Sequence, residues 1–535
     1  MNDIEQTQRL GFAGRLLNAV EWAGNKLPDP VTLFVIGALL VPVISQVVYM
    51  LGWEVEMVAP TQAGREVVLQ GTGETIRALP MLTWDSLYGW TSRLIDNFLK
   101  FPPLGIVLVG MLGIGVAERS GLIGALMKAL MVITPKQLLT PMMVFVGVMS
   151  SAGSDAGYVV LPPIAALLYL SVGRSPLAGI AAVFAGVSAG FCANLLITAL
   201  DPILAGFSQS AAQIVAPDYT VDPRSNYWFA AVSTLFLTVI GWGVTAWFVE
   251  PRLNQRHADR GGPSLPTELD HETTRISPLE KRGLIWTGLA ALTVGGIAYS
   301  LIAVPGLMLH GTDPDSGKDR WIEVIVPLLF IGFLLPGLVY GIAAKSIRND
   351  KDVARMMTES IAALAPIIVL AFFAGQFIKW FDQSNLGAML AITGGRAIAE
   401  SGLPTWAVLT AFILLVAVLN LFIGSMSAKY TLLAPVFIPM FMIGASMSPE
   451  LTQAAYRVGD SCTNIITPLN AYLIIILVFV QKYDKKAGMG TMIALMLPYS
   501  VVFFITWTAL LLAWVSFGFQ LGPEGPLEYV PTIGQ

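Results

Sequence analysis

The sequence predicts an all-α polytopic membrane protein with nine transmembrane helices and two re-entrant hairpins. Of its 535 residues, 55% are hydrophobic and only 12% carry a formal charge, and the mean hydropathy is +0.69. A soluble domain usually carries about twice that charged fraction, and a disordered chain contains far fewer apolar residues. Apolar stretches of spanning length recur along the chain, and two pairs of shorter ones are each divided by small polar residues.

Charge and cysteine content exclude several other classes. The net charge is −4, so the chain has no basic field for nucleic acid. Cys192 and Cys462 both lie in apolar stretches, which argues against a disulfide scaffold or a zinc cluster. The chain has no Gly-rich nucleotide-binding motif, so we expect neither ATP nor an organic cofactor to act through it.

The predicted elements follow one another with short polar connections. A spanning helix needs about 20 apolar residues. The predicted crossings are 30–53, 102–121, 176–206, 226–250, 281–306, 322–345, 356–380, 450–480 and 487–517. Residues 1–29 are a charged N-terminal segment without a cleavable signal-peptide pattern. We expect 54–101 to be an external loop that ends in an interfacial amphipathic helix, and 251–280 to be a solvated linker.

Two pairs of apolar arms are too short to cross and predict re-entrant hairpins. The first pair is 138–150 with 156–172, divided by SSAGSD, and the second is 405–424 with 429–446, divided by GSMSAK. Exposed backbone at such a tip is tolerated only inside protein or in a watery cavity. The two hairpins therefore predict a site inside the molecule.

Lysine and arginine predict the orientation of the spans. Residues 251–282, 345–355 and 482–486 are rich in Lys and Arg, which places them in the cytoplasm by the positive-inside rule. With residues 1–29 also inside, nine crossings place the 518–535 tail outside. On this orientation hairpin 1 (138–172) enters from the cytoplasm and hairpin 2 (405–446) enters from outside.

Three short motifs recur in the same order in the two halves of the chain. Residues 118–122 resemble 382–386, residues 158–163 resemble 430–435, and residues 192–198 resemble 462–467. These matches predict two repeats of opposite topology, 102–250 and 356–517. Inverted repeats with broken helices place a substrate site near the bilayer midplane. The unmatched segments 30–53 and 281–345 are expected to be framework or dimer-forming helices.

Charged side chains inside the repeats are the first candidates for binding, because such groups are costly in a bilayer. Arg457 and Asp460 share a helix face and can form a structural ion pair. Alternatively, Arg457 holds an anionic group while Asp460 helps to bind a cation or a proton. Lys429, at the second tip, either snorkels or binds substrate, and Asp201 is either a helix-end charge or a site residue.

Polar groups at the tips and breaks are candidates for binding a coupling ion. Neutral oxygens and carbonyls freed by a helix break suit Na⁺, whereas a proton-driven carrier needs a carboxyl group that changes protonation. The residues alone do not choose between Na⁺ and H⁺, and in the second case Asp201 or Asp460 would be the proton carrier. The candidate Na⁺ ligands are Ser150, Ser154, Asn194, Ser425 and Asn464.

The same segments carry a family resemblance. Residues 425–430, 434–435, 456–461 and 464–470, together with 157–161, 193–194 and 200–202, resemble the p-aminobenzoyl-glutamate transporter (AbgT) family. The resemblance covers about 15–520 and implies a homodimer of the cell inner membrane with nine transmembrane helices and two hairpins. A Trp is expected where Tyr430 stands. The implied substrate-binding residues are Asp201, Asn420, Ser427, Tyr430, Pro449, Arg457, Asp460 and Pro468.

The resemblance implies an ion-coupled secondary transporter and not an enzyme, and the wider superfamily to which it points favours Na⁺ over H⁺ as the coupling ion. Its cargo would be p-aminobenzoyl-glutamate-like aromatic carboxylates, or sulfonamide antimetabolites whose export gives antibiotic resistance. The facing hairpins suggest an elevator-type movement, by symport or antiport. The alternative is a Na⁺-coupled carrier of dicarboxylates or other organic anions. A channel is less favoured because inverted hairpins imply occlusion, and an intramembrane enzyme because the spans lack a nucleophile paired with His.

Overall fold

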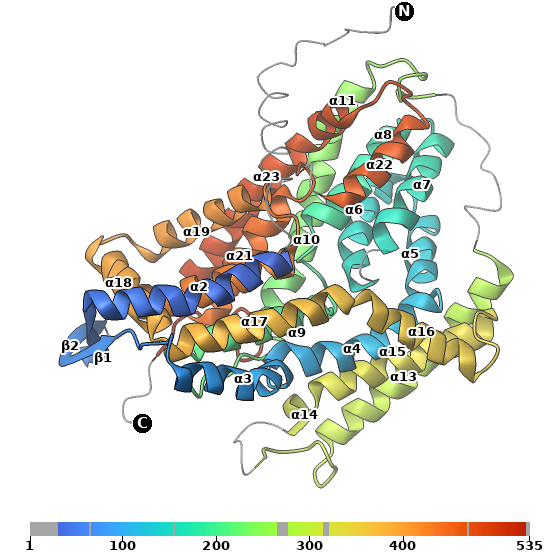
Figure 1. Cartoon of the computed structure of the whole chain (residues 1–535). Coiled ribbons are helices and arrows are strands. Elements are labelled where there is room, and N and C mark those ends of the chain that lie inside the picture. Colours follow the sequence, from blue (N-terminus) through green and yellow to red (C-terminus); the bar gives the residue numbers. More distant parts are fainter. Residues whose placement is uncertain are drawn as a thin grey trace, which may run out of the picture.

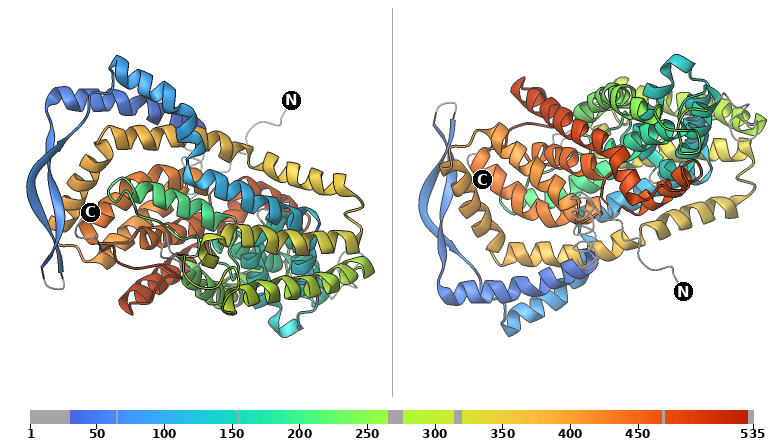
Figure 2. Two further views of the ribbon diagram at one scale, coloured as in Figure 1. Left: turned by 90° about the horizontal axis from the view of Figure 1, so that it is seen from below. Right: turned by 90° about the horizontal axis from the view of Figure 1, so that it is seen from above.

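A computed structural model describes residues 30–63, 66–153, 156–264, 276–313, 320–467 and 470–530. Within these ranges the fold is helical except for one antiparallel ribbon, formed by β1 (Glu54–Ala63) and β2 (Glu66–Arg77) (Figure 1). The ribbon lies at one edge of the molecule in every view (Figure 2). It occupies the start of the segment that the sequence predicts to be an external loop.

One group of helices lies along one side of the molecule (Figure 1). α4 packs against α15, α15 against α13, and α2 against α17. α3 also packs on α17, and the Thr83 side chain caps its first turn. The members are α2 (Pro30–Leu51), α3 (Trp84–Leu99), α4 (Pro102–Arg119), α13 (Pro278–Ala303), α15 (Ile325–Ala344), α16 (Asp350–Ala363) and α17 (Ala365–Gln383).

Both predicted hairpins form helix pairs at the expected positions. Hairpin 1 consists of α6 (Leu139–Met149) and α7 (Ala156–Ser171), and hairpin 2 consists of α19 (Thr405–Asn420) and α20 (Met426–Ala445). The expectation that both arms of hairpin 2 are too short to cross is wrong for α20, which has 20 residues. The Ser425 side chain accepts a hydrogen bond from the Ala428 amide and so starts this helix before residue 429.

Two predicted crossings are broken at their polar segments. α8 (Pro176–Phe184) continues through η3 (Ala185–Ala189), and the chain becomes helical again only at α9 (Leu200–Ala212). In the second half, α21 (Pro449–Thr463) ends before α22 (Ala471–Gln481). The remaining long helices of this region are α10 (Tyr227–Val244), which continues through η4 (Thr245–Val249) into α11 (Glu250–Leu253), and α23 (Met489–Ser516).

The sequence does not predict α5 (Leu122–Val132) and α18 (Leu386–Glu400) as separate helices. Each begins after a residue with positive φ, Gly121 at 91° and Asn385 at 62°, a conformation that Gly and Asn tolerate best. α4 and α5 are bent by 53° at this junction. The matching motifs at 118–122 and 382–386 therefore mark equivalent helix junctions.

By length and composition, six helices within the described residues can cross a membrane, or eight if each of two bent pairs counts as one span. These apolar helices make the chain a membrane protein. The count of nine crossings and the external tail stay predictions.

In both halves of the chain, the hairpin makes similar contacts with the neighbouring broken helix. Tyr158 packs edge-on against Phe184, with ring centroids 6.1 Å apart, and Tyr430 packs against Tyr456 at 4.4 Å. A methyl group added to Gly186 would meet the backbone of Val144 on α6. In the second half, one added to Gly459 would lie 2.5 Å from the Ile413 carbonyl on α19. In both halves a hairpin arm thus lies directly against a glycine of the broken helix.

We expect Gly459→Ala to lower the free energy of unfolding by about 1–3 kcal/mol, because the new methyl group has no space beside Ile413 and Val416. Gly295→Ala on α13 is the matched control, since an added Cβ meets nothing there within 4 Å. The control should be neutral or slightly stabilising. The two melting temperatures in one detergent make the comparison, and equal values would contradict the close packing of α19 on α21.

Candidate substrate and ion site

Arg457 is buried in the middle of α21, a helix whose side chains from Pro449 to Cys462 are all buried. Its Nη1 lies 2.7 Å from Oδ1 of Asp201, in the first turn of α9. The other oxygen of Asp201 accepts hydrogen bonds from the amide and hydroxyl of Thr198, at 2.6 and 3.0 Å. Arg457 and Asp201 thus join the second broken helix to the first.

Of the two alternatives for Arg457 and Asp460, the structural ion pair between them does not form. The two residues are one helical turn apart, but each forms an ion pair with another element. Arg457 pairs with Asp201, while Asp460 pairs with Lys429 on hairpin 2, with 2.6 Å between Lys429 Nζ and Asp460 Oδ1.

A narrow pocket opens beside Arg457 and Asp201, and we call it the Arg457 pocket. Its other walls come from the non-helical break of the first half, with Phe191 and Thr198, and from the segment that leads into α10 and the start of that helix, with Pro223 and Tyr227. Among the described residues, Arg457 Nε is buried without a hydrogen-bond partner. The pocket has space for roughly one water molecule, so an organic anion can enter only after these walls separate.

Lys429 does not snorkel. Its side chain is 1% exposed, and Nζ donates to Asn420 Oδ1 and to the Ile423 carbonyl in addition to its ion pair with Asp460. These residues come from the end of α19, from the tip that follows it, from the start of α20 and from α21. We call Lys429, Asn420, Ile423 and Asp460 the Lys429 cluster. It fixes the tip of hairpin 2 against the broken helix.

Asn420 connects this cluster to the break after α21. Its amide nitrogen lies 2.7 Å from the Asp460 carbonyl, 2.9 Å from Thr463 Oγ1 and 2.8 Å from Asn464 Oδ1. Three acceptors therefore surround a group with two N–H donors. Hairpin 2 and Asn464 therefore lie close together, as the sequence predicts, and Asn420 makes the contact between them.

Tyr430, Ser427 and Pro449 lie outside the lining of the Arg457 pocket. The Tyr430 ring is fully buried against Tyr456, and its hydroxyl lies 2.6 Å from Ser208 Oγ on α9. Ser427 is partly exposed near the hairpin tip. Pro449 opens α21 about two turns before Arg457. Of the eight residues implied by the resemblance, the structure gathers Asp201 with Arg457 and Asn420 with Asp460, and Pro468 lies outside the described residues.

The candidate Na⁺ ligands are hydrogen-bonded within the protein. In the first half, Ser150 Oγ donates to the Gly147 carbonyl at 2.6 Å, and Asn194 donates to Ser151 Oγ at 2.8 Å. In the second half, Ser425 caps α20 and Asn464 accepts from Asn420. Ser154 lies outside the described residues. Each hairpin thus meets an Asn of the neighbouring break.

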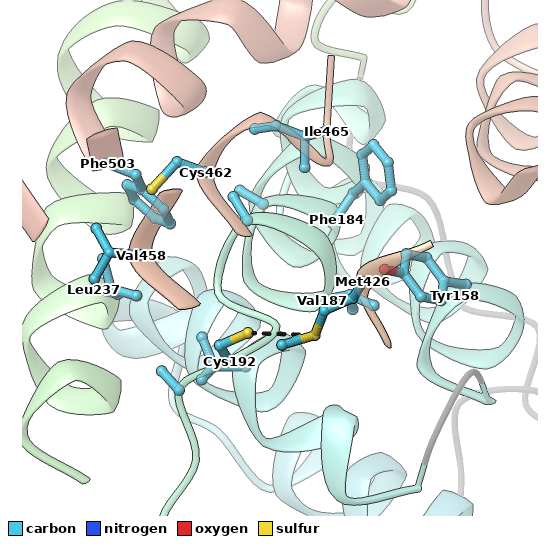
Figure 3. Packing of buried hydrophobic residues seen from close by; sticks show 14 of the residues in the cluster. Tyr158, Phe184, Val187, Cys192, Leu237, Met426, Val458, Cys462, Ile465 and Phe503 are labelled. Atoms are coloured by element: carbon cyan, nitrogen blue, oxygen red, sulfur yellow. Dashed lines mark hydrogen bonds between the residues drawn. The ribbon is translucent and has the colours of Figure 1, made fainter. Parts of the chain in front are cut away.

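Two sulfur atoms make a further contact between the first half and the second half of the chain. Cys192 Sγ, in the first break, lies 3.8 Å from Met426 Sδ, at the start of α20 (Figure 3). Both cysteines are buried free thiols, and Cys462 packs among apolar residues near Phe503 (Figure 3). Within the described residues, no group of three His, Cys, Asp or Glu side chains could hold a metal ion.

The sequence predicts some of the residues of the site but not how they pair. It identifies Arg457, Asp201, Asp460 and Asn420, but not the ion pairs and hydrogen bonds that they form. Lys429 is absent from the predicted binding residues, although a lysine at a buried polar tip is itself a signal that a carboxylate lies nearby.

Known proteins resemble this chain over nearly its whole length. The profile of the AbgT putative transporter family matches residues 15–529. The p-aminobenzoyl-glutamate transport protein of Escherichia coli K12 is 33% identical over 512 residues, which cover 96% of each chain.

Two solved structures are also similar. The YdaH transporter of Alcanivorax borkumensis, described as having an unusual topology, is 40% identical with a TM-score of 0.83, covering 93% of this chain and all of its own. MtrF of Neisseria gonorrhoeae, described as illuminating a class of antimetabolite efflux pumps, is 41% identical with a TM-score of 0.86. That match covers 96% of this chain and all of MtrF.

Proposed function

The chain belongs to the AbgT putative transporter family, and we propose that it carries p-aminobenzoyl-glutamate-like aromatic carboxylates across the cell inner membrane as an ion-coupled secondary transporter. The match to the family profile confirms the resemblance seen in the motifs. The name of the E. coli relative supports this substrate class. The description of MtrF supports antimetabolites as a second cargo. We propose that these are of the sulfonamide type, with antibiotic resistance as the consequence of their export.

The observation that carries the proposal is the buried Arg457 at the wall of a pocket, paired with Asp201 and with its Nε unpartnered among the described residues. A guanidinium presents several N–H donors in one plane and binds a carboxylate with two of them. A substrate carboxylate would compete with Asp201 for Arg457. Phe191 and Tyr227 in the same lining suit an aromatic ring.

We propose that loading the site requires a conformational change. The Arg457 pocket is too small for an aromatic carboxylate, and Asp201 holds Arg457 from the opposite broken helix. Separation of α9 from α21 would release the guanidinium and widen the pocket. The matching contacts of the two halves support inverted repeats that move, as in an elevator, against the other helices of a homodimer with nine crossings per subunit.

We propose Na⁺ as the coupling ion, with H⁺ as the alternative. The supporting observation is the meeting of each hairpin with an Asn of the neighbouring break, Asn194 in the first half and Asn464 in the second. The serine and amide oxygens there are neutral, hard donors. Asp201 and Asp460 would carry the proton in the alternative.

Binding to the purified protein tests the substrate class. We expect p-aminobenzoyl-glutamate to raise the melting temperature in a saturable manner, and succinate to have little effect at the same concentration. The reverse preference would support the alternative, a carrier of dicarboxylates or other organic anions. Absence of any effect from both p-aminobenzoyl-glutamate and a sulfonamide would contradict the proposal.

A further inference from the structure

The Lys429 ammonium lies in surroundings that resemble an alkali-cation site. Its acceptors are a carboxylate oxygen of Asp460, the amide oxygen of Asn420 and the backbone carbonyl of Ile423. These three acceptors match the three N–H donors of an ammonium group. Asn420 is the last residue of α19 and Ile423 follows it, so the negative end of that helix adds to the attraction for a cation.

Oxygen donors of this kind hold coupling ions in carriers with broken helices. Unwound backbone carbonyls and the C-terminal ends of half-helices coordinate Na⁺ or H⁺ there. In this chain the same kinds of group converge on a charge that is covalently part of hairpin 2. Lys429 and Asp460 are both buried, with side-chain exposures of 1% and 0%.

We infer that Lys429 is a tethered cation that fills a second-half ion site, so that this half of the protein closes without a mobile ion. The inference deepens the proposed ion coupling, since it leaves the first half, with Ser150 and Asn194, to bind any coupling Na⁺. It also makes Lys429 a positioning residue, which holds the tip of hairpin 2 on α21 through Asp460.

The first half lacks the whole group at the matching positions. The repeated motifs align Gly157 with Lys429, Gly190 with Asp460, and Val148 with Asn420. A Cβ added to Gly190 would lie 2.6 Å from Val148 Cγ2, and one added to Gly157 would meet Ser150. This space is therefore closed by Val148, Ser150 and the Gly186 carbonyl in the first half. At the aligned positions, the amide, the carboxylate and the ammonium occur together in the second half alone.

Removal of the ammonium tests the inference directly. In Lys429→Ala the Asp460 carboxylate is left buried without its cation, and the truncated side chain leaves space at the three acceptors. We expect this variant to melt below the wild type in choline chloride and to regain on the order of 2 °C or more in NaCl, beyond any Na⁺ effect on the wild type. The readout is stability and not transport, so a wrong substrate assignment does not affect it.

The matched control is Lys429→Ala combined with Asp460→Asn, which removes both charges. It should show no more Na⁺ response than the wild type, because the carboxylate that would hold the ion is gone. Choline chloride and KCl at equal ionic strength separate specific binding from screening.

Three results would overturn the inference. One is a Lys429→Ala variant that does not distinguish Na⁺ from choline. Another is an equal Na⁺ response in the doubly substituted control. The third is failure to recover folded Lys429→Ala in NaCl, whether or not the control folds, because Na⁺ would then be unable to replace the ammonium.

Discussion

Arg457→Lys is expected to reduce the flux of p-aminobenzoyl-glutamate about 10- to 100-fold, and to reduce the flux of a neutral sulfonamide much less. Lysine keeps the positive charge but loses the planar pair of donors that fits a carboxylate. Hydrogen bonds to charged groups contribute about 1.5–3 kcal/mol each, which corresponds to this range. The buried position of Arg457 strengthens the effect, since water cannot replace the missing donor.

Initial rates in proteoliposomes, corrected for the amount of folded protein, measure this effect. Arg174→Lys is the matched control because Arg174 forms a bidentate pair with Glu250, at 2.6 and 2.8 Å, away from the lining of the Arg457 pocket. The control should transport both substrates like the wild type. An equal loss for the carboxylate and the sulfonamide in Arg457→Lys would show that Arg457 serves to hold Asp201 and not the substrate.

A Na⁺ gradient imposed at clamped pH is expected to drive p-aminobenzoyl-glutamate to an accumulation of up to about tenfold for a tenfold gradient and one coupled ion. The limit follows from the free energy of the gradient, about 1.4 kcal/mol per tenfold ratio. If Lys429 fills the second-half ion site, the coupling ion binds in the first half, and substitution of Asn194 should weaken the Na⁺ dependence more than it weakens substrate binding.

The matched experiment imposes a pH gradient in the absence of Na⁺. The Na⁺ proposal predicts little accumulation under that condition. Accumulation that follows the pH gradient, ignores Na⁺ and disappears in Asp460→Asn would instead assign coupling to a proton. The hairpin contacts of Asn194 and Asn464 would then be structural caps.

The helical fold and the two hairpins could be predicted because hydropathy and small polar tips are local properties of the chain. The boundaries of α6, α7 and α19 lie close to the expected ones for this reason. α5 and α18 cannot be predicted as separate helices in this way, because apolar sequence continues on both sides of the junctions and a positive φ at Gly121 and Asn385 divides the helices. The motif at these junctions identifies a repeat, but it does not by itself predict a turn.

The candidate site could be predicted as a set of residues but not as a set of pairs. Arg457 and Asp460 satisfy the spacing for a local ion pair, and local spacing is all that a single sequence supplies. The structure instead pairs Arg457 with Asp201 and Asp460 with Lys429, across elements far apart in the chain. Tertiary packing decides which ion pairs form, because hairpin 2 and the two broken helices meet only in the folded protein.

Counterflow in proteoliposomes tests the central claim most directly, because it requires neither the coupling ion nor the direction of transport to be known. Vesicles loaded with unlabelled p-aminobenzoyl-glutamate are diluted into a trace of the labelled compound. We expect transient, saturable accumulation of label that protein-free vesicles do not show and that internal succinate does not support. Folded protein that gives no accumulation, or that exchanges only succinate, would contradict it.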